Sequence, residues 1–223
     1  MTGQLNLLLA SDEPDRDCPY CPRLAAYRAA NRAGNPDWFN APVPSFGPPS
    51  ARLLVVGLAP GVKGANRTGR PFTGDYAGDL LYATLIDFGF ATGTYDARPD
   101  DGLTLTDCRI TNAVRCVPPQ NKPDGSEIAR CRPFLAATIS AMPKLKAILA
   151  LGRIAHDSTV SALGAKRSTM PFAHGTAHPT AAGPTLFDSY HCSRYNTNTR
   201  RLTEAMFRQV FEQISAHLNQ PER

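Results

Sequence analysis

The sequence predicts an α/β fold: a three-layer α/β/α sandwich around a short, mostly parallel, four-stranded central sheet. Short continuous apolar runs, typical of strands buried on both faces, alternate with stretches whose apolar residues recur at helical spacing. This alternation is typical of helices packed on a parallel sheet. A length of 223 residues suits one well-buried core. We therefore expect a single domain over residues 1–223, with the segment of about residues 15–50 packed on it.

The elements follow from these patterns in order. The expected strands are residues 52–57, 108–114, 147–151 and 186–192. The expected helices are residues 79–88, residues 126–140 with Ser126 as N-cap, a stretch from residue 153, and an amphipathic stretch from residue 199. Residues 33–50 are rich in Pro, Gly and Asn and predict an irregular crossing. Because ligands bind at the carboxyl ends of parallel strands, the loops after residues 57, 112 and 190 are the expected site.

The amino-acid composition limits where the protein can reside and which kind of partner it can bind. Apolar residues make up 42% of the chain and charged residues 19%, with no apolar run long enough to span a membrane. The apolar stretch at residues 5–10 has no basic residue before it and acids after it, which is the wrong pattern for a signal peptide. A cytoplasmic protein is expected. The net charge of +5 favours a polyanionic partner such as DNA.

The cysteines are more informative by spacing than by number. Six thiols in a reducing compartment do not indicate a disulfide framework. Cys18 and Cys21 form a C-x-x-C pair, and fourteen residues separate Cys116 from Cys131. Buried thiols, a redox pair, zinc and an iron–sulfur cluster all remain open on spacing alone. Cys108 is expected to be a buried small apolar residue.

A glycine-rich loop follows the first expected strand, at residues 57–75. It matches neither the P-loop pattern nor the dinucleotide-binding pattern. Its cationic side chains suit nucleic-acid phosphates, and Phe72 is either a stacking platform for a base or an inward anchor. Asp75 is the only carboxylate in the loop, and its position alone favours a cap for the following helix. The cationic residues are Lys63, Arg67 and Arg70.

Three segments together resemble the family-five (B-type) iron–sulfur uracil-DNA glycosylases. GLAPGVKGANRTGRPFTGD (57–75) resembles the first motif of that family. TNAVRCVPPQNKP (111–123) looks like the segment that carries the family's central Asn and third cluster cysteine, and HCSRYN (191–196) looks like its second active-site motif. The resemblance extends from about Cys18 to the terminal helix. It implies a [4Fe–4S] cluster held by Cys18, Cys21, Cys116 and Cys131.

The resemblance also implies roles for individual residues. A target base must leave the stack before its glycosidic bond can be reached. Phe72 would stack on it, Asn112 would bond its Watson–Crick edge, and His191 would donate to the oxygen where negative charge develops. Asp75 would stabilise the cationic sugar and orient water. Further substrate-contacting residues would be Gly57, Ala59 and Gly61, and further DNA-contacting residues Ser193, Arg194, Tyr195 and Asn196, with Tyr195 as wedge.

Two residues depart from superfamily patterns. Ala59 stands where other branches carry an acid or amide that activates water; family five also lacks that group. Cys192 replaces the proline of the usual H-P-S motif. His178-Pro-Thr mimics that motif more closely, but no Asn follows it at the right spacing. We therefore assign the role to His191 and interpret His156, His174 and His217 as structural.

The expected activity is excision of uracil and other damaged bases from DNA, without strand cleavage, because the matched motifs contain no Schiff-base lysine. The alternative is a non-catalytic or covalent binder of uracil-containing DNA. An insert of the kind found in covalent relatives is missing before His191. An iron–sulfur electron carrier would leave Asn112 and His191 unexplained. DNA is the only expected partner, and a monomer is expected.

Overall fold

The computed structural model describes residues 11–220, so the apolar stretch at residues 5–10 lies outside the described residues. A five-stranded sheet runs through the molecule in the order β4-β1-β5-β7-β6. Its strands are β4 (Cys108–Asn112), β1 (Leu53–Gly57), β5 (Ala147–Leu151), β7 (Thr185–Ser189) and β6 (Ala177–His178). The first four are parallel, and β6 pairs antiparallel with β7. The predicted fold class is confirmed, although the sheet has five strands rather than four.

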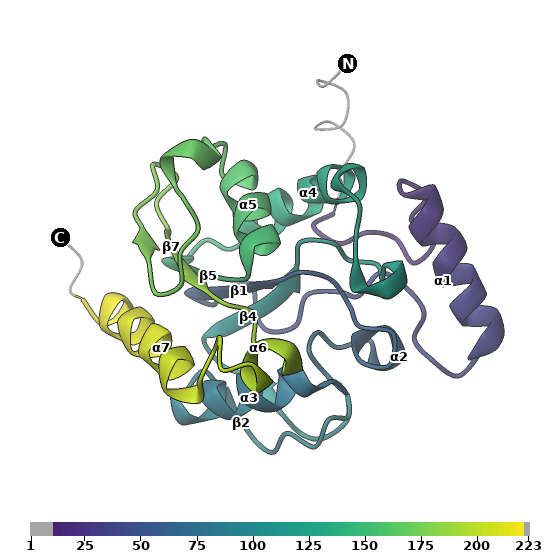
Figure 1. The fold of residues 1–223 in the computed structure, drawn as a ribbon, viewed down its shortest axis with the longest axis horizontal. Helices are drawn as coiled ribbons and strands as arrows, with labels where there is room; N and C mark the ends of the chain where they lie inside the picture. The colour runs from purple at the N-terminus through teal and green to yellow at the C-terminus, as the bar shows by residue number, and fades with distance from the viewer. Residues whose placement is uncertain (1–10, 221–223) are drawn as a thin grey trace.

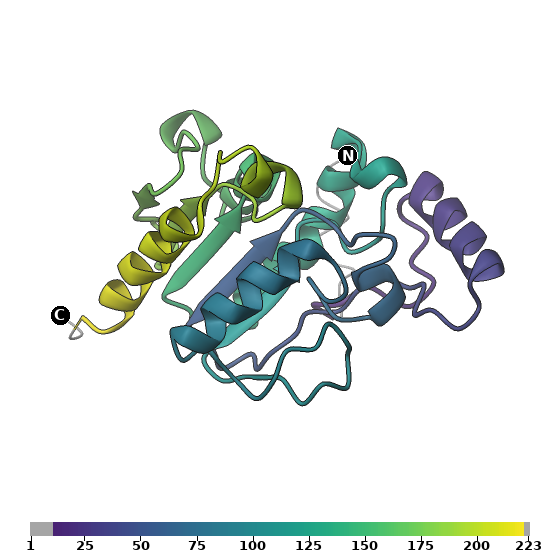
Figure 2. The same ribbon diagram turned by 60° about the horizontal axis from the view of Figure 1, so that its bottom comes forward.

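Helices cover both faces of the sheet (Figures 1 and 2). Helices α3 (Tyr76–Asp87) and α7 (Glu204–Leu218) lie on one face, and α4 (Gly125–Ser140) and α5 (Arg153–Ala162) lie on the other. Strand β1 shows how side chains are divided between the faces, because successive residues point to opposite sides. Leu53 and Val55 join the core under α3 and α7, whereas Leu54 and Val56 join the core under α4 and α5.

The start of α4 corrects one prediction. Its N-cap is Asp124, not Ser126, and Asp124 forms a reciprocal capping box with Glu127. The Glu127 carboxylate accepts from the Asp124 amide at 2.7 Å and also bonds Arg23. A capping box satisfies two helix-end amides, which explains why the helix starts earlier than the apolar pattern indicates.

Several elements, most of them short, have no clear periodic signal in the sequence. These are α1 (Pro22–Gly34), α2 (Ala65–Thr68), α6 (Arg194–Asn198), the pair β2 (Ala91–Thr92) and β3 (Thr104–Leu105), and 3-10 turns at Pro119–Asn121 and Arg167–Thr169. Helix α1 lies at the end of the molecule opposite α7 (Figure 1). Its Leu24 packs with Val114 and Phe134. None of the helices described is both long and apolar enough to cross a bilayer.

Candidate active site

A cavity of about 840 Å³ opens at the carboxyl ends of the strands. The loops after β1, β4 and β7 contribute to its wall, as the strand-end rule predicts. Leu151 at the end of β5 and residues 152–155 after it form a further wall that the strand-end expectation omitted. The signal was present, since Gly152 ends an apolar strand just as Gly57 does. Tyr76, Arg153 and Ile154 line this cavity and were not predicted; Tyr76 and Ile154 are exposed aromatic and aliphatic side chains.

Asp75 is enclosed by glycines in the cavity wall. A Cβ on Gly64 would lie 2.5 Å from Asp75 Oδ2, and one on Gly61 would lie 3.2 Å away. Asp75 is the N-cap residue of α3, but its side chain makes no capping bond, and its buried Oδ1 has no hydrogen-bond partner among the described residues. Burial raises the pKa of Asp75, while the nearby backbone amides of Gly78 and Ala77, which fall outside capping geometry, oppose the shift. The carboxylate therefore has an unused acceptor next to an open cavity.

His191 reaches the cavity from the loop after β7. Its ring makes no hydrogen bond within the part of the chain that the structure describes, and enclosure by protein lowers its pKa to about 4. The imidazole is thus neutral near pH 7, with one N–H available to donate. The Asn196 side-chain amide donates to the His191 carbonyl at 2.8 Å, so Asn196, predicted to contact DNA, holds the backbone of this histidine.

Phe72 and Asn112 stand together above Gly57. A Cβ on Gly57 would lie 2.5 Å from Phe72 Cζ and would collide with Asn112 Oδ1, so only glycine allows both side chains to approach the end of β1. The Phe72 ring is 6% exposed and stacks with His191 at 5.9 Å between centroids and 27° between planes. Phe72 and Asn112 both line the cavity, whereas Gly57 lies behind them.

The residues predicted to bind DNA divide into two groups. Lys63, Ser193 and Arg194 line the cavity, Arg67 is exposed, and Tyr195 is the most exposed large apolar side chain described, at 72%. Arg70 differs and corrects the prediction. Its guanidinium is buried and makes a bidentate pair with Asp101 at 2.8 and 2.7 Å, so it holds the loop instead of facing a phosphate.

The four predicted cluster cysteines lie around one small, largely apolar cavity beside α1. Two donors point at their sulfurs: Arg28 Nη1 lies 3.3 Å from Cys116 Sγ, and the Arg115 amide lies 3.3 Å from Cys131 Sγ. All six cysteines are free thiols. Four convergent thiols with N–H donors to sulfur are a donor set that fits an iron–sulfur cluster. Ala59 connects this region to the active site, since it lines the large cavity and packs against the cysteines.

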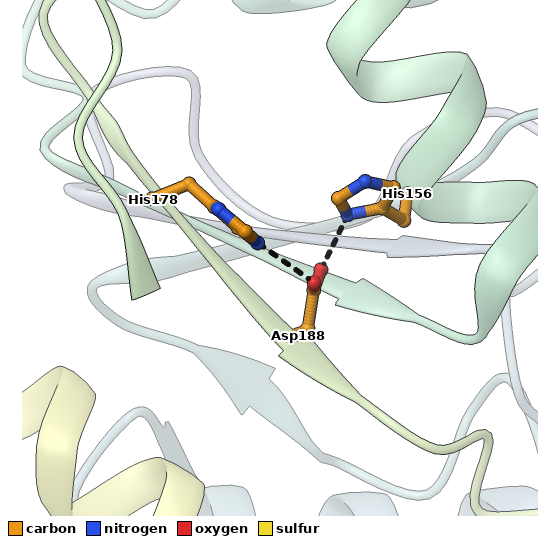
Figure 3. Close-up of side chains that lie close together, drawn as sticks. All are labelled: His156, His178 and Asp188. Atoms are coloured by element: carbon orange, nitrogen blue, oxygen red, sulfur yellow. Dashed lines mark hydrogen bonds and ion pairs between the residues drawn. The ribbon is translucent and has the colours of Figure 1, made fainter. Parts of the chain in front are cut away.

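A second titratable group lies outside the cavity (Figure 3). Asp188 on β7 accepts from His156 Nδ1 at 2.6 Å and from His178 Nε2 at 3.1 Å. His156 Nε2 bonds the Met170 carbonyl at 2.8 Å, which fixes a proton on that nitrogen. Burial lowers the pKa of His156, but hydrogen bonding and the charge of Asp188 outweigh it and raise the pKa. His178, the closer H-P-S mimic, thus faces Asp188 and not the cavity.

Comparison with known proteins gives a consistent result. The model of the uracil DNA glycosylase superfamily matches residues 44–215. A type-5 uracil-DNA glycosylase of Thermus thermophilus is 44% identical over 199 residues, covering 86% of this chain and 90% of the relative. Type-5 enzymes of Pyrobaculum aerophilum and Mycobacterium tuberculosis are 38% and 40% identical, over 90% and 88% of this chain and 88% and 76% of theirs. These matches confirm the resemblance drawn from the three motifs.

Proposed function

Because the chain belongs to the uracil DNA glycosylase superfamily, with type-5 enzymes among its relatives, we propose that it hydrolyses the N-glycosidic bond of uracil in DNA. The reaction begins base-excision repair and leaves the strand uncut. The small, apolar Ala59 in the cavity wall leaves room for other deaminated or damaged bases. DNA is then the substrate.

The leaving base is bound by three side chains. Phe72 stacks on the flipped base, and the Asn112 amide pairs with its Watson–Crick edge through one donor and one acceptor. As the C1′–N1 bond breaks, its electron pair moves onto the base and reaches the carbonyl oxygen beside N1. His191 donates a hydrogen bond to that oxygen. The low pKa of His191 leaves the imidazole neutral near pH 7, and a neutral imidazole still carries one N–H that can donate this hydrogen bond.

Asp75 acts on the sugar. Departure of the base leaves an oxocarbenium-like deoxyribose, which a nearby carboxylate stabilises. The same carboxylate accepts a hydrogen bond from the attacking water, whose oxygen forms the new bond to C1′, and then receives the water's proton. The unpartnered Oδ1 of Asp75, buried beside the cavity that holds His191 and Asn112, is the observation that carries this proposal.

The test is release of free uracil from a labelled duplex with one uracil, against a matched thymine duplex. Wild type should release uracil, and Asp75→Ala and His191→Ala should each lose about 10²–10³-fold in rate, the range for removing a charge-stabilising group. Asp79→Ala is the matched control, because Asp79 is an exposed acid in the first turn of the same helix. If no damaged base is released, the chain is a binder of damaged DNA. Release that survives Asp75→Ala returns Asp75 to a structural role.

We further propose that Cys18, Cys21, Cys116 and Cys131 hold a [4Fe–4S] cluster. A zinc ion would hold four sulfurs about 3.8 Å apart, given a Zn–S bond of about 2.3 Å. Among the described residues, only His156, His178 and Asp188 bring three metal-capable atoms within 4.8 Å of one another. Four thiols around one cavity, with N–H donors to two of the sulfurs, support a multi-iron cluster. Bound there, the cluster would tie the segment at the start of α1 to the loop after β4 and to α4, a structural role beside the DNA-binding face.

Cys131→Ser should lower bound iron and protein stability together, as measured by iron analysis and thermal unfolding. Cys108→Ala is the control, since Cys108 is buried in β4 away from the four thiols and should keep its iron. Full iron content and unchanged stability in Cys131→Ser would overturn the ligand assignment.

The remaining proposals concern the DNA-binding face, the location of the protein in the cell and its assembly state. A net charge of +5 and the exposed Arg67 and Tyr195 support a DNA-binding face around the cavity mouth. We propose that the whole chain works as one domain, as a cytoplasmic monomer without an obligate protein partner. Size-exclusion chromatography with light scattering tests the assembly state.

A further inference from the structure

Phe72 adopts a backbone conformation that is costly for its residue type. Its φ is 54°, in the left-handed region that bulky residues enter only when their surroundings force it. Such a conformation in a residue that stacks on substrate indicates that neighbouring groups hold it. We propose that residues 93–103, which join β2 to β3, are a clamp that positions Phe72 through Tyr95 and Asp101. This inference rests on the proposed function.

Tyr95 binds the strained residue itself. Its hydroxyl donates to the Phe72 carbonyl at 3.1 Å. The Tyr95 ring stacks on Tyr82 of α3 at 4.6 Å, and the Tyr82 hydroxyl donates to the neighbouring Pro71 carbonyl at 2.6 Å. Gly78 of α3 makes room for this arrangement, because a Cβ there would collide with both the Phe72 carbonyl and the Tyr95 hydroxyl. Two successive carbonyls of the loop are thus fixed by two stacked tyrosines.

Asp101 holds the loop on either side of Phe72. Its carboxylate makes the buried bidentate pair with Arg70, and Arg70 Nε donates to Thr73 Oγ1 at 2.7 Å. Backbone amides of Asp96 and Leu103 donate to Asp101 at 2.9 and 3.1 Å, so the clamp segment is folded around this carboxylate. The Arg70 guanidinium also keeps the pKa of Asp101 well below its usual range. The ion pair therefore persists at any working pH.

The clamp acts at a distance from the substrate. Neither Tyr95 nor Asp101 lines the cavity, and the Phe72 ring faces His191 inside it. Releasing the Phe72 carbonyl lets the backbone relax toward negative φ, and the ring then turns out of its stacked position. The expected loss is in the rate of base release rather than in affinity for DNA, since neither Tyr95 nor Asp101 carries a positive charge that could hold a phosphate.

Single-turnover release of uracil from a duplex tests the clamp. Tyr95→Phe removes one hydroxyl and keeps the stacked ring. It should lower the rate constant about tenfold, which corresponds to about 1.4 kcal/mol, while the DNA concentration for half-saturation changes less than about twofold. Tyr27→Phe is the matched control, because it removes a tyrosine hydroxyl from α1, far from the loop. If Tyr95→Phe does not fold, Asp101→Asn replaces it in the same assay.

A double-mutant cycle separates positioning from general weakening. In a Phe72→Ala background, adding Tyr95→Phe should change the rate less than about twofold, because no ring remains to be positioned. A full tenfold loss in that background would overturn the clamp. An active wild type with an unaffected Tyr95→Phe variant would overturn the clamp alone, whereas a wild type that releases no uracil would overturn the proposed function and the clamp together.

Discussion

The cavity wall and the His156–Asp188–His178 group are two sets of acid and imidazole side chains with opposite hydrogen bonding. In the cavity wall, Asp75 has a buried oxygen without a partner, and the His191 ring has no hydrogen bond among the described residues. In the second group, both Asp188 oxygens are bonded to histidines (Figure 3). Both His156 nitrogens are also bonded, since Nε2 donates to the Met170 carbonyl. Folded proteins normally satisfy buried polar groups, and an acceptor without a partner in the wall of an open cavity is available to a ligand.

This difference in hydrogen bonding indicates which histidine and which carboxylate serve the chemistry. A satisfied group has its donors and acceptors committed to the fold, and it joins elements: Asp188 on β7 holds His156 of α5 and the segment that carries His178. An unsatisfied group costs stability and keeps its atoms for substrate.

The largest effect on stability is expected from Asp188→Ala. It leaves two imidazoles without their carboxylate in a buried site, and breaking a buried pair from one side costs about 3–5 kcal/mol. Equilibrium unfolding in urea measures the loss. Asp157→Ala is the control, because the Arg153–Asp157 pair is at the surface and is worth at most about 1 kcal/mol. Equal losses in the two variants would mean that the buried group does not hold the fold.

The pH dependence of stability should have opposite signs for the two histidines. His156 has a raised pKa in the folded state, so its stabilisation is full below its unfolded value of 6.5 and is lost as pH rises through the folded pKa. His191 has a lowered pKa of about 4, so the unfolded state takes up its proton first and stability rises with pH toward 6.5.

Each slope is at most about 1.4 kcal/mol per pH unit. Unfolding free energies of wild type, His156→Gln and His191→Gln between pH 5.5 and 9 measure both. In His156→Gln, the unfolding free energy should no longer decline at higher pH. In His191→Gln, it should no longer rise as pH increases toward 6.5. The contrast fails if both variants shift the profile in the same direction.

The smallest effect on stability is expected from Asp75→Asn, and we expect this variant to be more stable than wild type. Burial raises the pKa of Asp75, so keeping it ionised near pH 7 costs stability, and removing the charge should stabilise the protein by about 0.5–2 kcal/mol. Thermal unfolding measures the gain. A clear loss of stability would instead indicate that the carboxylate caps α3.

The sequence predicted the four parallel strands. Strands β1 and β5 are continuous apolar runs, and both start and end within one residue of the prediction, whereas β4 and β7 also contain polar residues. It missed β6, since a two-residue strand has no periodicity. It also missed α1, where Leu24 and Arg28 are the buried residues and the apolar pattern is weak. The Asp124–Glu127 pair in the sequence has the spacing of a capping box and indicates the true start of α4, but the N-cap was assigned to Ser126.

The site residues could be predicted where they fall within local sequence motifs. Asp75, Phe72, Asn112 and His191 fall in three motifs, and all four line one cavity. Arg70 was misassigned because its partner, Asp101, lies 31 residues away in a loop without a motif. Sequence position shows that an arginine is near a site, but only the packing of distant segments shows whether its charge is already paired.

One single-turnover measurement of uracil release by wild type, Asp75→Asn and Asp188→Ala, each normalised to folded protein, tests directly which group performs the chemistry. We expect a loss of about 10²-fold or more for Asp75→Asn and a rate within about threefold of wild type for Asp188→Ala. The opposite ranking, with Asp75→Asn active and folded Asp188→Ala inactive, would contradict this expectation and move the chemistry to the bonded group.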